Sequence, residues 1–185
     1  MKTAASVKAG FKYHIEHLRS IDVMRAMGLS IDGLEKRGDK VVLSVEDVTN
    51  LIPTEGLNYM LGTALTGVAQ LAAWYIAIFE GNYTPVSTIT AATFPANATE
   101  STAYNETTRV AWTPGVIAAG SVDNSASKAV FTINATKTIY GIGQLSVSTK
   151  SATTGTLISC ALFSAAKAVV ATDILNVTST ISATS

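Results

Sequence analysis

The chain has 185 residues and a formal net charge of zero; 48% of its residues are hydrophobic and only 14% are charged. The neutral balance argues against a nucleic-acid-binding protein, which would carry an excess of basic residues on one face. A chain of this length can fold as one domain without a disulfide or a metal, and its near-zero charge favours association with other subunits.

No apolar run is long enough to cross a bilayer, and residues 1–14 lack the continuous apolar core of a secretory signal. There is no disulfide framework and no zinc-binding spacing. The single cysteine, Cys160, lies in an alternating apolar segment, so we expect a buried and inert thiol. Together these features predict synthesis in a reducing cytoplasm.

Residues 11–18 alternate apolar and polar side chains, as a half-buried strand does. His14 and His17 lie three positions apart on this strand, so their side chains should face opposite sides and cannot form a metal-binding pair. No carboxylate cluster surrounds them in the sequence, and we expect both to be surface or boundary residues.

Residues 19–34 could form a short helix that one of the segment's glycines ends. Residues 36–39 are typical of an exposed turn. The alternation then resumes with Val41, Leu43 and Val45, which predicts a second strand. The first fifty residues therefore predict a hairpin that carries an irregular insertion.

Residues 51–85 form the stretch around which the rest of the chain is organised. Thr54 can cap a helix and Glu55 would lie in its first turn, while Gly67 suits a left-handed C-terminal cap. Apolar residues recur between them at three- and four-residue steps, which predicts one short helix near residues 54–66 with one apolar stripe. The stripe consists of Leu57, Met60, Leu61, Ala64, Leu65 and Val68.

Residues 70–79 are apolar at nearly every position, with Trp74 near the centre. An antiparallel strand with one wet face would alternate, so this pattern predicts a strand that is covered on both faces. The short helix and this strand would form the nucleus of the core.

The remainder of the chain predicts loops followed by short strands. Residues 82–108 are rich in Thr, Ala, Asn and Pro and lack helical periodicity. Gly141 and Gly143 interrupt a later strand, where they indicate bulges or close backbone contacts. The strands expected after the loops are residues 109–112, 129–136, 138–147, 156–163 and 175–181.

This pattern predicts a mainly β fold, an antiparallel and jelly-roll-like β-sandwich. Residues 1–50 would be an N-terminal hairpin or arm, and residues 51–185 the sandwich core, within one continuous domain. Most of the charge lies in the first part. Because charges fix register and orientation between partners, residues 1–40 are the predicted place for specific docking.

No catalytic constellation is present in the sequence. Glu100, Glu106 and Asp123 are the acidic candidates, but no residue of defined role is paired with them, so we expect solvated loop carboxylates. Gly141-Ile142-Gly143 lacks the third glycine and the helix of a dinucleotide site. We therefore predict that the protein is not an enzyme and has no catalytic, cofactor-binding or metal-binding residues.

Seven segments carry a resemblance to known proteins: residues 50–61 (NLIPTEGLNYML), 73–85 (AWYIAIFEGNYTP), 91–95, 100–104 with Arg109, 123–126, 139–141 and 173–178. Together they resemble small structural proteins of tailed bacteriophages. The resemblance covers about residues 45–185 and includes no catalytic motif. Residues 19–40 depart from the pattern through extra length before the second strand.

The resemblance implies a virion protein that is assembled in the bacterial host cytoplasm. We expect a capsid cement or decoration protein that bridges and stabilises neighbouring major capsid subunits. Its partners would be the major capsid protein and copies of itself, without nucleic acid, membrane or cofactor. The alternative is a tail, collar or host-attachment component that binds glycan through the loop aromatics Tyr83, Tyr104 and Trp112.

Overall fold

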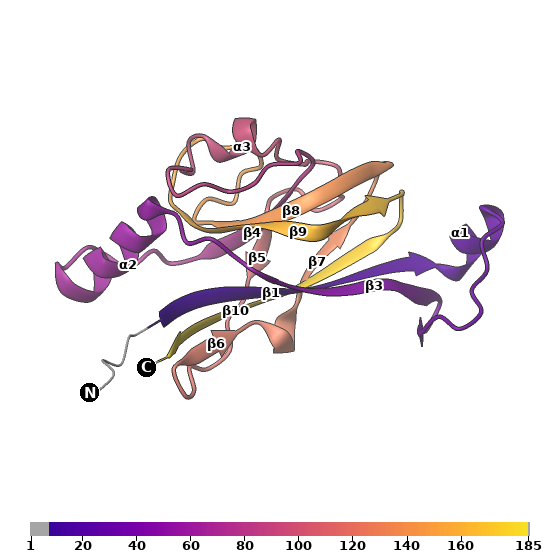
Figure 1. Cartoon of the computed structure of the whole chain (residues 1–185), viewed down its shortest axis with the longest axis horizontal. Coiled ribbons are helices and arrows are strands. Elements are labelled where there is room, and N and C mark those ends of the chain that lie inside the picture. The colour runs from indigo at the N-terminus through magenta and orange to yellow at the C-terminus, as the bar shows by residue number, and fades with distance from the viewer. Residues whose placement is uncertain (1–7, 185) are drawn as a thin grey trace, which may run out of the picture.

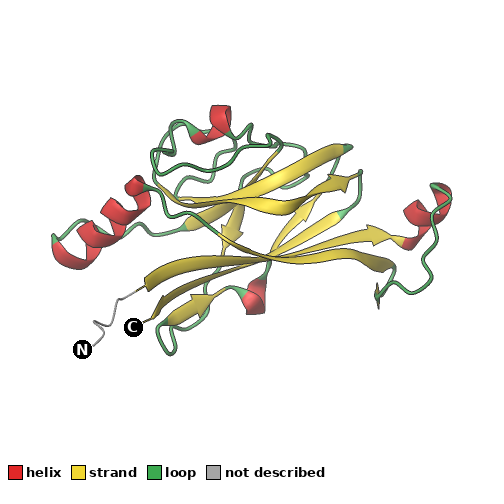
Figure 2. Cartoon of the chain, in the orientation of Figure 1, coloured by secondary structure: helices red, strands yellow, loops and turns green. Residues whose placement is uncertain are grey.

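A computed structural model describes residues 8–184, which form two antiparallel β-sheets with few helices (Figures 1 and 2). The prediction of a mainly β, antiparallel fold is confirmed. The helices are α1 (Ile21–Ala26), α2 (Thr54–Leu65), α3 (Phe94–Asn97) and the 3-10 helix η1 (Ser125–Ser127). The strands are β1 (Lys8–Ser20), β2 (Lys36–Arg37), β3 (Lys40–Thr49), β4 (Trp74–Phe79), β5 (Val110–Trp112), β6 (Ser121–Asp123), β7 (Ala129–Thr132), β8 (Lys137–Leu145), β9 (Leu157–Val169) and β10 (Ile174–Thr184).

The first sheet has the strand order β2–β3–β1–β10–β6, and β7 also pairs with β10. The second sheet has the order β5–β4–β8–β9. The N-terminal strand β1 lies between β3 and the last strand, β10. The N-terminal hairpin and the C-terminal end of the chain are therefore neighbours in one sheet.

The main core lies between the two sheets. Tyr13 and Ile15 of β1 and Phe131 of β7 belong to the same buried cluster as Ile76 and Ile78 of β4. Burial alternates along β1 from Phe11 to Ile15, which confirms the predicted pattern for this part, whereas residues 15–19 are all buried. Apolar side chains from the facing sheet surfaces thus fill one continuous core.

Strand β4 is covered on both faces, as its apolar sequence predicts. Ile76 and Ile78 face the main core, whereas Ala77 and Phe79 belong to a second buried cluster under α3 and its flanking loops. The strand is shorter than expected, and Trp74 is its first residue rather than its centre. All four residues from Ile76 to Phe79 are fully buried.

Two glycines of β8 make room for this second cluster. A Cβ atom on Gly141 would collide with the Phe79 ring, and one on Gly143 would lie 2.7 Å from the Phe94 ring. The pairing of β8 with β9 also shifts register next to Gly141. The bulge and the close contacts expected at these glycines are confirmed.

The N-terminal insertion carries α1 and β2 and projects from the end of the molecule opposite α2 (Figure 1). Helix α1 ends just before Gly28, whose φ of +69° suits a left-handed residue after a helix. The expected alternation of β3 is wrong, because Val41 and Val42 are both buried while Val45 is half exposed. A register shift in the pairing of β1 with β3 accounts for the broken alternation.

Helix α2 has the expected length but not the expected burial. Its N-cap is Pro53 rather than Thr54, and Gly67 has the predicted left-handed conformation, with φ of +73°. The apolar stripe does not face the core, and the buried residues of the helix are Gly56 and Gly62. The expectation that α2 belongs to the nucleus of the core is therefore wrong.

The segment of residues 82–108 is mostly loop, although the sequence patterns missed the single turn of α3. A buried ion pair fixes this segment: the Arg109 guanidinium donates to both carboxylate oxygens of Glu100, at 2.8 and 2.7 Å. Arg109 also donates to the Val147 and Ala152 carbonyls. Glu100 is thus a buried structural group, and the expectation of a solvated carboxylate is wrong for it.

Ile78→Ala should lower the free energy of unfolding by about 2–5 kcal/mol, because Ile78 is fully buried between the sheets. Trp74→Ala should cost less, since Trp74 is only partly buried and packs edge-on against Tyr59 of α2. Urea unfolding of both variants measures the difference. A larger loss for Trp74→Ala would contradict the placement of the core.

Candidate functional site

An uncharged apolar surface lies at the end of the molecule that carries α2 (Figure 1). It comprises residues 56–73, residues 113–122 and residues 181–183 at the end of β10, and we call it the α2-end surface. The longer stretches 56–79, 110–122 and 174–185, which include these residues, contain no charged residue. Its exposed large apolar residues, with exposed fractions from 43% to 92%, are Leu57, Leu61, Leu65, Val68, Val116 and Ile117.

Shallow hollows join the three segments into one surface. Met60 of α2, Ile117 and Ile181 line one hollow of about 300 Å³. A second hollow of about 290 Å³ lies between residues 70–74 and the loop that contains Ile117. Val122 of β6 borders both. The helix, the loop and the end of β10 therefore form a continuous face.

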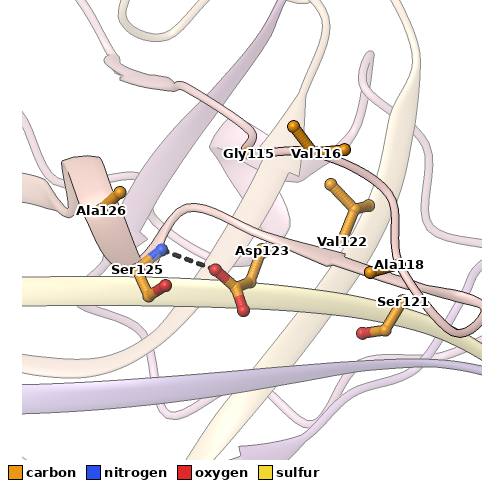
Figure 3. A pocket seen from close by; sticks show the side chains of 8 residues that line it. All are labelled: Gly115, Val116, Ala118, Ser121, Val122, Asp123, Ser125 and Ala126. Carbon is orange, nitrogen blue, oxygen red and sulfur yellow. Dashed lines mark hydrogen bonds between the residues drawn. The ribbon is translucent and has the colours of Figure 1, made fainter.

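A third hollow lies on the other side of the same loop, where Val116 and Val122 extend from facing segments (Figure 3). Asp123 is the charged residue among those that line it. Its carboxylate accepts a hydrogen bond of 2.8 Å from the Ser125 backbone N–H. The one charged group that lines this hollow thus already has a hydrogen-bond partner within the chain.

Helix α2 is fixed to the body by its first turn. One carboxylate oxygen of Glu55 accepts hydrogen bonds from the backbone N–H groups of Ala91, at 2.8 Å, and Leu157, at 2.7 Å. A Cβ atom on Gly56 would lie 2.7 Å from the Ile158 carbonyl oxygen, so the helix approaches β9 as closely as a glycine permits. Exposure rises along the helix, to 77% at Leu65. The far end of α2 is a protruding apolar lobe.

Charged residues gather instead on the outer face of the first sheet. Glu16 is buried there, and its carboxylate accepts from Arg37 at 2.6 Å, from Lys128 at 2.8 Å and from the Asn176 amide at 3.4 Å. Burial by itself would raise the pKa of Glu16, but hydrogen bonds and attraction from Lys128 and Arg37 outweigh it and lower the pKa to about 2. The cluster joins β1 to β2, to β10 and to Lys128, which lies between η1 and β7.

A lysine, an asparagine and a carboxylate are also the residue types of an amide cross-link, in which the amine attacks the carboxamide and ammonia leaves. Such a step needs a carboxylate that takes the proton from the lysine, and an efficient base has a pKa near the working pH. The pKa of Glu16 is far below that range. The contacts that the structure shows are hydrogen bonds from Arg37, Lys128 and Asn176 to Glu16, which join neighbouring segments of the chain.

His14 has the expected boundary position, whereas His17 does not. His17 is buried and its Nε2 lies 2.8 Å from a carboxylate oxygen of Asp173, which also binds Arg19 at 2.7 Å. His14 pairs with Asp47 at 2.8 Å. The expectation of a surface or boundary position is wrong for His17, and each histidine has a carboxylate partner. Within residues 8–184, no three His, Cys, Asp or Glu side chains are placed to bind a metal.

The remaining candidates are scattered. Glu106 is partly buried, and its carboxylate accepts a hydrogen bond of 3.1 Å from the Thr132 backbone N–H. Tyr104 and Trp112 are buried core residues rather than exposed loop aromatics, and Tyr83 is partly buried. Cys160 is fully buried as predicted, and burial raises the pKa of its thiol to about 12.

The α2-end surface was missed because an apolar stripe has the same spacing whether it faces the core or solvent. One sequence signal does distinguish the two: a helix that lies on a core normally places charged residues on its other face. Residues 56–79 have none. A helix without a charged face that is not fully buried is a candidate for contact with another molecule.

No protein-family model and no curated protein sequence matches this chain. Among residues 8–184, no helix has both the length and the apolar character to cross a membrane.

The Glu16 cluster predicts a specific pH dependence of stability. The pKa of Glu16 is lowered from 4.5 to about 2 on folding, so the stabilisation is present above about pH 4.5 and is lost as the pH falls toward 2. Arg37 and Lys128 are 40% and 35% exposed, so solvent screening reduces the effect to about 1–2 kcal/mol.

Urea unfolding of the wild type and of Glu16→Gln between pH 2 and 7 measures this dependence. The wild type should be the more stable protein near pH 6, and the two curves should converge toward pH 2. A difference that is independent of pH would contradict the ionised state of Glu16.

Proposed function

We propose that the protein is a non-enzymatic structural protein of a phage particle, a capsid cement or decoration protein that bridges and stabilises neighbouring major capsid subunits. The observation that supports this most is the α2-end surface, where six large apolar side chains are exposed on segments without a charged residue. The sequence resemblance to phage structural proteins supplies the virion context.

A surface of this kind is suited to binding protein. Contiguous exposed apolar patches are uncommon on monomeric proteins unless they bind something. Docking such a face removes no charged group from water, so the desolvation cost is small. Each Leu, Ile or Val side chain that becomes fully buried contributes about 1.5–3 kcal/mol. Contacts of modest size reinforce one another when a protein binds several shell subunits at once.

The proposal includes a jelly-roll-like arrangement of the two sheets and a virion location. It also includes the major capsid protein as a partner. The alternative, a tail, collar or glycan-binding component, loses part of its basis, because Tyr104 and Trp112 contribute to the core and are not available to stack on a sugar.

Quantitative mass spectrometry of purified particles tests the location. A shell-bridging protein should be present in numbers comparable to the major capsid protein, whereas a tail or collar component should be far less abundant. Absence from the particle, or a tail-like copy number, would overturn the proposal.

A second measurement tests the stabilising role. Particles that lack the protein should lose their shells at a lower temperature than complete particles, and addition of the purified chain should restore the difference. The same addition of a Leu61→Glu, Leu65→Glu variant should restore less, because it places charge on the α2-end surface. Shells of equal thermal stability with and without the protein would contradict a cement role.

A further inference from the structure

We propose that the α2-end surface binds the same surface of a second copy of this chain. This inference rests on the proposed function, since it names a partner for that surface. Contacts between copies would then be made at the α2 end. The charged insertion and the outer face of the first sheet, at other places on the molecule, would stay available for a different protein (Figure 1).

The charge distribution favours a second copy as the occupant. In a contact between identical surfaces related by a two-fold axis, both copies bring the same net charge to the contact, so a charged surface would repel its partner. The three segments of the α2-end surface contain no charged residue, so the contact brings no like charges together. The whole chain has a formal net charge of zero, and long-range repulsion between copies is therefore absent as well.

The rest of the molecule offers no comparable face among the described residues. Met27 and Leu29 are exposed close to the charged residues Arg25 and Asp32, and Val130 is exposed on β7 between Lys128 and Lys137. Val86 is the single exposed large apolar residue of the uncharged residues 81–99. On the outer face of the first sheet, Glu16 and Asp47 are surrounded by cations. A contact between two such faces would have to desolvate or rearrange these ion pairs.

The exposed apolar side chains supply about half of the area of a standard contact. A fully buried Leu or Ile side chain removes on the order of 100 Å² of apolar area from water. With their exposed fractions, the six large apolar residues of the α2-end surface therefore offer on the order of 400 Å². A standard interface buries about 800 Å² on each partner. The small and polar residues of the same segments, such as Ala64, Ala72 and Ala118, are exposed beside them and supply further area.

The first test is the association state of the purified full-length chain, measured by sedimentation from about 1 to 100 µM, a range in which a Kd of ~10 µM is well determined. The wild type should associate within this range. Leu65→Glu should weaken association at least ~10-fold, because each copy would bring an unpaired charge into the contact. Leu29→Glu is the matched control: it makes the same change at an exposed residue of the opposite end and should associate like the wild type.

The second test locates the contact. Leu65→Cys and Leu29→Cys each add one exposed thiol, while the native Cys160 is fully buried and should give no background. A maleimide should react with Leu65→Cys more slowly at 100 µM, about the top of the range, than after dilution below the Kd. Its reaction with Leu29→Cys should not change with protein concentration.

A wild type that stays monomeric throughout the range, or equal association of Leu65→Glu and the wild type, would overturn the self-contact. Concentration-independent labelling of Leu65→Cys would do so too. Particle composition separates this failure from that of the proposed function. A monomer that is still abundant in shells would leave the capsid role intact and assign the surface to another subunit. An oligomer that is absent from particles would leave the self-contact intact and reject the capsid role.

Discussion

The fold depends on the complete burial of one strand. Ile76 to Phe79 of β4 are apolar and fully buried, so both faces of the strand need a cover. The first sheet covers one face, and residues 82–108 with α3 cover the other. Burying a loop costs free energy unless its polar groups form hydrogen bonds. Here Glu100 pairs with Arg109, and the backbone N–H groups of Glu80 and Gly81 donate to the carbonyls of residues 99 and 98. Gly141 and Gly143 leave the space that the aromatic rings of this cover require.

The parts of the fold that could be predicted from the sequence are those that depend on local patterns of apolar residues. The alternating strands and the doubly covered β4 follow from local patterns of apolar residues, because burial on one or two faces is encoded residue by residue. Gly141 and Gly143 are also predictable locally, because a glycine inside a strand indicates a bulge or a close backbone contact. The shift that buries Val41 beside Val42 depends on how β1 pairs with β3, a long-range property that spacing within either strand does not contain.

The errors in the candidate site have a similar origin. Sequence patterns predict a solvated Glu100 and a surface or boundary His17, because their partners, Arg109 and Asp173, are recognisable only after the chain has folded. Asp173 follows His17 by 156 residues, so no local motif connects them. The spacing of the α2 stripe predicts an apolar helix face but does not say which molecule covers it. Its lack of a charged face was the one local signal of a different role.

The distribution of charge links the fold to the proposed contact. Several charged groups form ion pairs that join elements: Glu16 with Arg37 and Lys128, and Glu46 with Lys167 between the two sheets. These charged groups are paired within one copy of the chain. The segments of the α2-end surface contain no charged residue. A protein with few charges thus has a polar, internally paired side and an apolar end that can meet a neighbour.

Helix α2 buries little of its own surface within one copy of the chain. The helix has twelve residues, two of which are glycines, and no charged pair along its surface. Isolated helices of this length are marginal in water, and most helical stability comes from packing of an apolar face. Within one copy, α2 is held mainly by Glu55, by the contact of Gly56 with β9 and by the packing of Tyr59 on Trp74. Its remaining turns leave Leu61 and Leu65 in solvent, so a neighbour that covers them would supply the packing that the chain alone does not provide.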